Sequence, residues 1–265
     1  MRAHALVWVV VAASACGRLS FDPLAGDGGF ADARIDGPPP VPSNVMHEQT
    51  SATFGGNVSA LGVMHTVTSA NTVMLAFVST RNSSPTPPPT VSSITFGTQA
   101  LTRLTSQCPD CGNAGINNLE LWVLANPAMG TSQIDATLSG SAKGAAVLVS
   151  SYVGASAFAS ETSVFGNGGT ASIAWTNPNE GAWAVAGVMD QGGFALSLIA
   201  NTAQTERSDT QCDPSDYQAA NTADQRGVAA NQQVAFSWTI GQGTGTNCIT
   251  SLQDRNWIAI GVSIY

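Results

Sequence analysis

The chain has little positive charge. Lysine and arginine together number nine, against seventeen aspartate and glutamate residues, and Lys143 is the single lysine. Proteins that bind nucleic acids neutralise backbone phosphates with clusters of basic side chains, and the sequence contains no such cluster. We therefore predict that the protein does not bind nucleic acid. Its acidity also gives no attraction to anionic lipid headgroups.

Long apolar runs and catalytic motifs are missing as well. The run from Ala5 to Ala13 is far shorter than the roughly 20 residues that a membrane-spanning helix needs, and no later run approaches that length. The chain has no G-x-S-x-G nucleophile elbow and no H-E-x-x-H zinc motif. Beyond the N-terminal region the only histidines are His47 and His65, which we expect on the surface or in loops. A triad hydrolase or a zinc hydrolase therefore has no support in the sequence.

The first fifteen residues have the three-part pattern of an export signal. Arg2 and His4 give a charged start, the apolar run follows, and the small residues Ala13-Ser14-Ala15 come directly before Cys16. The next stretch is rich in glycine, aspartate and proline, a composition that predicts a disordered tether. The expected organisation is a signal peptide at 1–15, a lipid-anchored linker at 16–45 and a folded domain at 46–265.

Small residues before a cysteine also permit cleavage by the lipoprotein route. Cys16 is the odd one among five cysteines, and a disordered linker is what a domain needs to stand clear of a membrane. Acyl chains on one cysteine are sufficient for firm anchoring. We predict that Cys16 carries lipid and holds the protein at the outer membrane or cell surface. The alternative is ordinary cleavage at the same bond and a secreted, soluble protein.

The other four cysteines are even in number, which favours two disulfides in an exported chain. Either Cys108 pairs with Cys111 and Cys212 with Cys248, or the pairing is crossed between the two loops. A four-cysteine zinc site and a redox-active C-x-x-C are the alternatives. The second half of a zinc site is missing, however, and no helix N-terminus is predicted that would lower a thiol pKa.

The region after residue 46 predicts strands. Near the C-terminus the isoleucines at 258, 260 and 264 fall on one face and Trp257 on the other, and the segment 234–240 alternates in the same way. Short apolar runs between turn residues predict further strands at 72–79, 119–125, 131–139, 145–153, 170–176 and 181–189, and a hairpin at 91–104 that turns near Gly97.

These strands together predict an all-β fold, an antiparallel β-sandwich that is jelly-roll-like. The segments 80–90 and 205–227 are polar, and we expect them to be loops. Within the second of them, 214–225 is a candidate for one short helix.

A hairpin around Gly97, a strand containing Trp122 and a turn Pro127-Ala128-Met129-Gly130-Thr131 follow one another in this chain. This series resembles an uncharacterised β-sandwich module of bacterial secreted and surface proteins, over about residues 48–265. The resemblance implies no catalytic residues. The start of the chain, with Cys16 and a Gly/Asp-rich spacer, is similar to bacterial lipoproteins of deltaproteobacterial type. Gly17 after the cysteine resembles signals that direct a lipoprotein to the outer membrane.

Candidate ligand-binding residues are few. Trp257 and Trp122 would offer rings for stacking on sugars if exposed, and Glu120 shares the strand face of Trp122. We nevertheless expect Glu120 on a solvated face. An acidic loop suits extracellular calcium, with the candidate ligands Asp209, Asp213, Asp216 and Asp224; no other cofactor is expected.

The leading hypothesis is a non-catalytic surface module that displays or binds an extracellular ligand, either a glycan or a protein. A carbohydrate-binding jelly roll is the second hypothesis. A glycoside hydrolase that uses Glu120 is the third.

Overall fold

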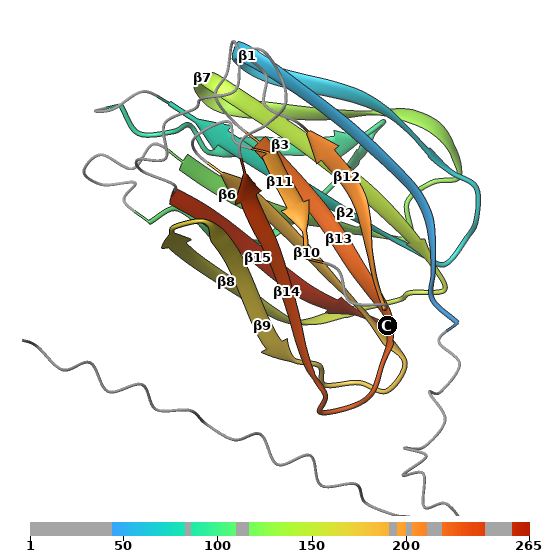
Figure 1. Ribbon diagram of the computed structural model, residues 1–265. Helices are drawn as coiled ribbons and strands as arrows, with labels where there is room; N and C mark the ends of the chain where they lie inside the picture. Colours follow the sequence, from blue (N-terminus) through green and yellow to red (C-terminus); the bar gives the residue numbers. More distant parts are fainter. Residues whose placement is uncertain are drawn as a thin grey trace, which may run out of the picture. The chain divides into compact units, whose positions relative to one another are not determined.

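The computed structural model describes residues 44–82, 86–109, 117–190, 195–199, 203–210, 219–241 and 256–265, all within the compact unit Pro38–Tyr265 (Figure 1). These ranges form strands that pair only in the antiparallel sense. They contain no helix, and therefore none that is long and apolar enough to cross a membrane. The prediction of an antiparallel all-β sandwich is confirmed.

The strands form three sheets, in place of the two sheets of a jelly roll. Sheet A has the order β4-β3-β7-β2-β6-β5, with β1 also paired to β7, sheet B has the order β12-β13-β10-β15-β8, and sheet C has the order β11-β14-β9. The bounds of the strands in sheet A are β1 (Met46–Val67), β2 (Thr72–Arg81), β3 (Val91–Phe96), β4 (Gln99–Ala100), β5 (Thr102–Gln107), β6 (Asn117–Ala125) and β7 (Gly130–Val153). Those of sheet B are β8 (Phe158–Asn167), β10 (Ala182–Asp190), β12 (Gln204–Thr210), β13 (Ala219–Val228) and β15 (Asn256–Ile264). Those of sheet C are β9 (Thr170–Thr176), β11 (Ala195–Leu198) and β14 (Gln233–Gly241).

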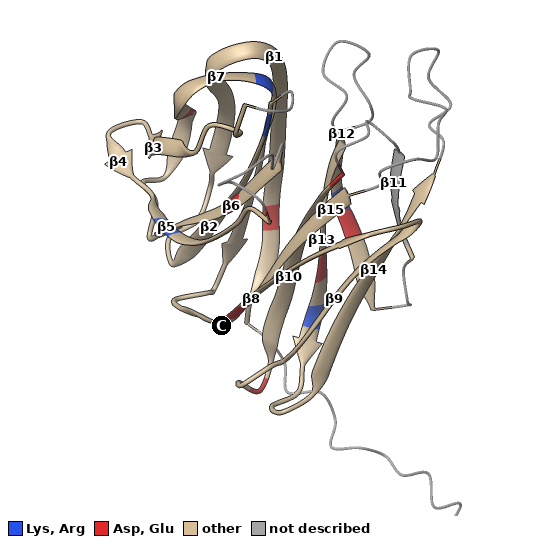
Figure 2. Ribbon diagram, turned by 90° about the vertical axis from the view of Figure 1, so that its left-hand side faces the viewer, with Lys and Arg blue, Asp and Glu red and all other residues tan. Residues whose placement is uncertain are grey.

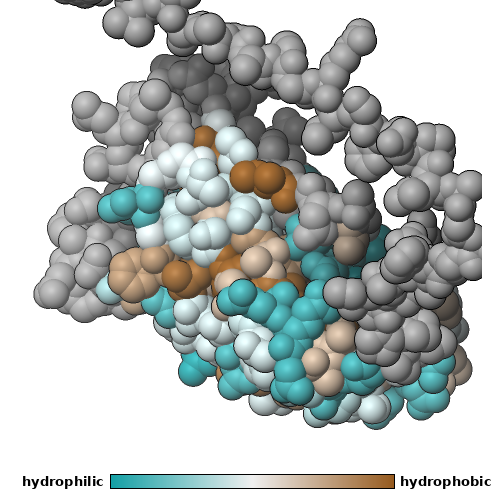
Figure 3. All heavy atoms as spheres, turned by 60° about the horizontal axis from the view of Figure 1, so that its bottom comes forward, coloured by the Kyte–Doolittle hydropathy of each residue, from teal (hydrophilic) through white to brown (hydrophobic). Residues whose placement is uncertain are grey.

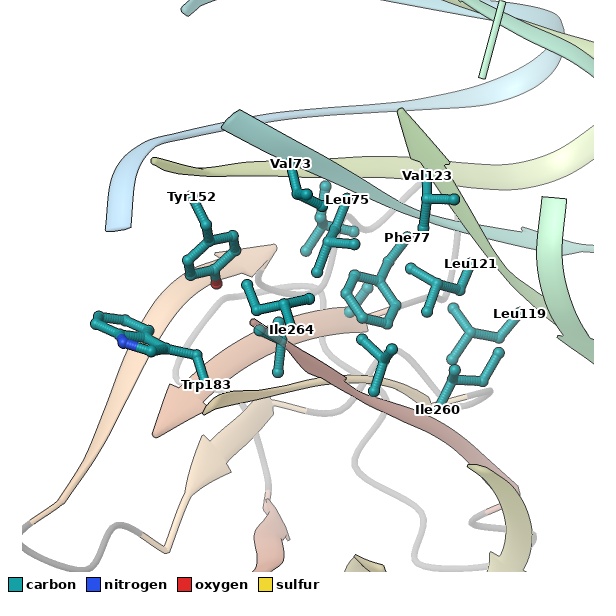
Figure 4. Packing of buried hydrophobic residues seen from close by; sticks show 14 of the residues in the cluster. Val73, Leu75, Phe77, Leu119, Leu121, Val123, Tyr152, Trp183, Ile260 and Ile264 are labelled. Atoms are coloured by element: carbon teal, nitrogen blue, oxygen red, sulfur yellow. The ribbon is translucent and has the colours of Figure 1, made fainter. Parts of the chain in front are cut away.

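Sheet B lies between the other two sheets and is covered on both faces (Figure 2). One face carries the isoleucines of β15, which pack against β2, β6 and β7 of sheet A in a central core (Figure 4). The other face carries Trp257 and the alanines of β10 and β13, which pack against sheet C in an outer core. Successive side chains of a strand point to opposite faces, so the strands at the centre of sheet B are buried throughout.

Sheet A folds back on itself because β1 and β7 form one long two-stranded ribbon that bends. The register of this pair shifts between Val58 and Ala60. Close to the shift, Asn57 has a φ of 54°, in the left-handed region that asparagine tolerates. Gly55 faces the Val58 side chain there, where an added Cβ would lie only 3.1 Å from it. The bent ribbon encloses a third apolar cluster, the ribbon core, to which β1, β2, β3, β6 and β7 contribute.

Strand β2 illustrates why such short apolar runs are buried on both faces. Its odd-numbered side chains from Val73 to Phe77 face the central core, and its even-numbered side chains from Met74 to Val78 face the ribbon core. Burying one large apolar side chain contributes about 1.5–3 kcal/mol. The strand therefore ties the folded-back sheet A to sheet B.

Most of the predicted strands are confirmed, namely those in β2, β6, β9, β10, β14 and β15. The hairpin near Gly97 is also confirmed. Phe96 pairs with Gln99 across a two-residue turn in which Gly97 has a φ of 57°, the conformation that such tight hairpins require.

Two predictions about the course of the chain are wrong. The separate strands expected at 131–139 and 145–153 are parts of the single strand β7. The described residues of the segment 205–227, which are 205–210 and 219–227, belong to β12 and β13 and not to a loop, and residues 219–225 of the expected helix are strand. The polar side chains that suggested a loop have partners inside the fold; Asn221, for example, accepts a hydrogen bond from Trp238 Nε1 at 2.9 Å.

The close packing of sheets A and B yields a stability prediction. A Cβ at Gly187 of β10 would overlap the Phe77 ring, whereas a Cβ at Gly140 of β7 would have no atom within 4 Å. We expect Gly187→Ala to lower the free energy of unfolding by about 1–3 kcal/mol, the usual cost of overpacking. Urea denaturation measures this value. Gly140→Ala is the matched control, expected to change the stability by less than about 0.5 kcal/mol.

Measuring Gly187→Ala in a variant with a smaller side chain at position 77 shows whether the cost arises from contact with the Phe77 ring. In Phe77→Leu, where the side chain is smaller, Gly187→Ala should cost less than in the native protein. Equal costs in both backgrounds would contradict the packing described here.

Candidate functional site

The titratable side chains with perturbed environments gather where β1 begins and β7 ends. Within the described part of the chain, every group whose pKa clearly departs from its ordinary value belongs to this region: His47, Glu48, His65, Tyr152 and Asp224. Perturbed pKa values cluster at functional sites. This region is therefore the candidate site.

Two polar side chains at the start of β1 bind the backbone at its end. Thr68 donates two hydrogen bonds to Glu48 Oε1, from its backbone N at 2.8 Å and from its Oγ1 at 2.6 Å. Thr66 N donates to Gln49 Oε1 at 3.1 Å. Strand edges leave backbone N–H groups unpaired, and these bonds satisfy two of them. These contacts close the bent ribbon. Together with the hydrogen-bonded side chains of Ser51, His65 and Ser151, they form what we call the polar seam.

His65 continues the seam inside the ribbon. Its Nε2 lies 3.1 Å from Ser151 Oγ and its Nδ1 lies 3.0 Å from Ser51 Oγ. Ser151 has one hydroxyl proton, which it donates to Glu48 Oε2 at 3.0 Å. His65 Nε2 must therefore be the donor toward Ser151, and Nδ1 accepts from Ser51. The chain of hydrogen bonds runs from Ser51 through a neutral His65 and Ser151 to an ionised Glu48.

The pKa values of the seam agree with these protonation states. Burial lowers the pKa of His65 from 6.5 to about 4, against a smaller opposing effect of the Glu48 charge. Burial acts to raise the pKa of Glu48, but the hydrogen bonds from Thr68 and Ser151 outweigh it and the pKa is lowered. At neutral pH the imidazole is uncharged and the carboxylate is charged.

A second group of side chains, the inter-sheet cluster, joins sheet A to sheet B beside the seam. Tyr152 OH donates to Asp224 Oδ2 at 3.0 Å, and Arg207 Nε donates to the same oxygen at 2.6 Å. The Tyr152 ring meets the Trp183 ring edge-on, with 5.6 Å between centroids, and the Arg207 guanidinium lies 6.0 Å from the Trp183 centroid. His47 meets Tyr152 edge-on at 5.5 Å.

Burial dominates the electrostatics of this cluster. It raises the pKa of Tyr152 well above its ordinary value, and the neighbouring Asp224 raises it further. Burial also raises the pKa of Asp224, although the bonds from Arg207 and Tyr152 oppose it. The pKa of His47 falls to about 4 through burial and the positive charge of Arg207.

The polar seam contains a hydroxyl next to an imidazole, as a catalytic nucleophile and its base would be, but this imidazole is too weakly basic for that role. Ser51 bonded to His65 resembles a hydroxyl and its general base. A base works best when its pKa lies near the working pH, and His65 with a pKa of about 4 is a weak proton acceptor. Both of its ring nitrogens are already bonded to protein hydroxyls. The geometry therefore favours a structural role for the seam.

The residues predicted to bind a ligand lie inside the fold. Trp257 is 7% exposed and Trp122 is 8% exposed, so neither ring has a free face on which a sugar could stack. Sheet C covers Trp257, and the folded-back ribbon covers Trp122.

The solvated position expected for Glu120 is wrong, because this residue is 0% exposed. Its carboxylate accepts hydrogen bonds from Val91 N at 2.8 Å, Asn118 Nδ2 at 2.8 Å and Trp122 Nε1 at 3.0 Å. The folded-back part of sheet A covers this face of β6, where a sheet covered on one side only would leave it in water. The bonds satisfy the carboxylate within the protein, as a buried charge requires.

The histidines were missed by the sequence reasoning, which placed them on the surface or in loops. Both lie in β1, and His65 is 0% exposed. A signal for His65 existed. It lies an even number of residues from Leu61, Val63 and Val67. In a strand such residues share one face, so this spacing predicts His65 on the apolar face.

The remaining predicted site residues are mostly outside the described part of the chain. Cys108 directly follows β5, while Cys16, Cys111, Cys212 and Cys248 lie outside the described residues. Disulfide pairing and lipidation therefore stay predictions.

The same holds for most of the calcium ligands. Asp213, Asp216 and the side chain of Asp209 are not described, and Asp224 is bonded to Arg207 and Tyr152. Among the described residues no three histidine, cysteine, aspartate or glutamate side chains are placed to hold a metal ion.

Comparison of the chain with protein-family models and with curated proteins finds no match.

The four cysteines give a mass prediction. If Cys108, Cys111, Cys212 and Cys248 form two disulfides, the intact mass should be about four hydrogens below that of the reduced protein, because each bridge removes two. Peptide mapping then gives the connectivity. Four free thiols in protein purified from its own cell envelope would contradict the pairing.

The inter-sheet cluster gives a stability prediction. Arg207→Gln removes the cation beside Asp224, whose side chain is 2% exposed, and breaking such a pair costs about 3 kcal/mol. We expect this loss in urea denaturation at pH 7, with part of it recovered in Arg207→Gln combined with Asp224→Asn. Arg226→Gln, which changes an exposed arginine of the same sheet, is the control. Native stability in Arg207→Gln would show that the ion pair does not stabilise the fold.

Proposed function

We propose that the protein is a lipid-anchored protein of the cell envelope, held by Cys16, whose β-sandwich displays or binds an extracellular partner without catalysing a reaction. The observation that carries the proposal is the stretch Ala13-Ser14-Ala15-Cys16 at the end of an apolar run. Small residues before a cysteine serve as a lipidation signal, and they are followed here by a spacer. The outer membrane or the cell surface is the proposed location.

The order of segments supports this proposal. The compact unit begins at Pro38 and its first strand at Met46. About twenty residues separate Cys16 from this unit, and they are rich in glycine and aspartate. We propose that they serve as the spacer between the lipid and the domain.

The chemistry of the described site supports a non-catalytic role. The side chains best suited to acid–base work, His65, Glu48 and Asp224, bond to groups of the protein itself. Each of them joins one part of the fold to another. A display or binding module needs a rigid frame of this kind. It does not need a side chain that is free of hydrogen bonds to the protein and able to act as a base.

The surface is consistent with a protein that faces water. Most of each strand carries no charge (Figure 2). On the face shown in Figure 3, hydrophobic side chains form short patches between pale and hydrophilic ones. Exposed large hydrophobic side chains are spread over several strands and turns, for example Phe54 in β1, Met129 before β7 and Phe165 in β8. Recognition of a partner is proposed to use this uncharged surface, since the tryptophans considered for sugar stacking are buried.

Substitution of the anchoring residue tests the proposal. We expect the native protein to fractionate with membranes and to carry acyl mass on a first peptide that begins at Cys16. Cys16→Ser should abolish the acyl mass, and the protein should stay uncleaved or become soluble. Fractionation followed by mass spectrometry of the N-terminal peptide measures both effects.

The control is Ser14→Ala, which changes the same stretch but keeps small residues before the cysteine, and it should fractionate as the native protein does. A native N-terminal peptide that begins at an unmodified Cys16 would exclude the lipid anchor and favour the secreted, soluble alternative.

A further inference from the structure

We infer that residues 46–51, the first segment of β1, form a strap that mild acid releases from the fold while the three apolar cores stay intact. The strap goes beyond the proposed function. It is a conformational device in the first strand of the folded unit.

The strap lies at an edge of its sheet and outside the apolar cores. It lies at an edge, because β1 pairs with β7 alone, and a register shift between His47 and Gln49 interrupts that pairing. Met46 is 60% exposed, and the following strap residues are half-buried. No strap residue belongs to any of the three cores. Segments of this kind open at a lower free energy than the core strands.

Polar bonds rather than apolar packing hold the strap in place. Glu48 and Gln49 bind the far end of β1, and Ser51 donates to His65. His47 lies against Tyr152 and within hydrogen-bond distance, 2.8 Å, of Thr50 Oγ1. Opening the strap therefore exposes both histidines to water, one on the strap and one beneath it.

Proton uptake favours the open form as the pH falls. Each histidine has a pKa of about 4 in the closed form and 6.5 when free. The closed form is thus unaffected above pH 6.5 and is progressively disfavoured between pH 6.5 and pH 4. At pH 5 each histidine should raise the opening constant by about thirty-fold.

The charged groups around the two histidines act in known directions. Arg207 of β12 faces His47 and disfavours its protonation in the closed form, and Glu48 partly favours it. The lowered pKa of Glu48 itself also favours opening, at lower pH, when its carboxylate is protonated. Asp224 of β13, with its raised pKa, takes up a proton more easily in the closed form and acts in the opposite sense. Tyr152 stays protonated throughout this range.

Release of the strap exposes the edge of β7 from Val149 to Val153, which is paired to the strap in the closed form. Val45, directly before the strap, belongs to the central core and stays in place, so the strap opens between two fixed ends. A bare strand edge accepts another strand.

Hydrogen-exchange mass spectrometry on the full chain at pH 7 and pH 5, corrected for the intrinsic pH dependence of exchange, tests this inference. We expect protection in residues 46–51 to fall by about a hundred-fold or more at pH 5, while peptides from β2 and β15 keep theirs. Equal protection of the strap at both pH values would overturn the inference. Loss of protection in β2 and β15 together with the strap would overturn it too, since that result means global unfolding.

Variants identify the groups responsible. His47→Gln and His65→Gln each retain a polar side chain that does not titrate, and each should remove about a thirty-fold part of the pH effect. The double variant should show almost none. Glu161→Gln, at an exposed carboxylate of β8, is the matched control and should behave as the native chain does. If either histidine variant opens as strongly at pH 5 as the native chain, that histidine does not drive the release.

Discussion

The pairing of β1 with β7 is the interaction on which the rest of the structure depends. The two strands contain 22 and 24 residues and stay paired along almost their whole length, although the ribbon bends back on itself. The free edge of β7 then pairs with β3 in its first half and with β2 in its second half. One ribbon thus organises sheet A, encloses the ribbon core and presents the opposite face of β2, β6 and β7 to sheet B.

The bend also explains why polar residues collect at one place. Folding back brings the start and the end of β1 together, at an edge whose backbone N–H groups need partners. Glu48 and Gln49 supply those partners, and His65 fills the space between Ser51 and Ser151. The inter-sheet cluster lies beside the seam because Tyr152 is next to Ser151 and points to the other face of β7. The perturbed pKa values follow from this crowding of polar groups into a buried region.

Alternation in the sequence was sufficient to predict the strands that became β14 and β15, but it could not show how many sheets cover each face. Trp257 and Glu120 fall opposite the isoleucines and leucines of their own strands, as expected. Both are nevertheless buried, because sheet C covers one and the folded-back ribbon covers the other. Such contacts join distant parts of the chain, and no local pattern contains them.

The polar composition of two segments also led to wrong predictions. The segment that forms β12 and β13 has the composition of a loop, yet Asn221 and Asp224 have buried partners on other strands, Trp238 and Tyr152. The single long strand β7 was divided in two because Ser139, Gly140 and Ser141 interrupt its apolar pattern. In the structure these residues lie opposite the bend in β1, where exposed small residues follow the curvature.

The central claim is that a neutral, buried His65 closes the folded-back ribbon. NMR spectroscopy of the two imidazole rings tests it most directly, since the nitrogen shifts report the tautomer and a pH titration reports the pKa. The account predicts that His65 carries its proton on Nε2 at neutral pH and titrates with a pKa near 4. A pKa near 6.5 with a mixture of tautomers would contradict it, because such a ring would be in water and not in the seam.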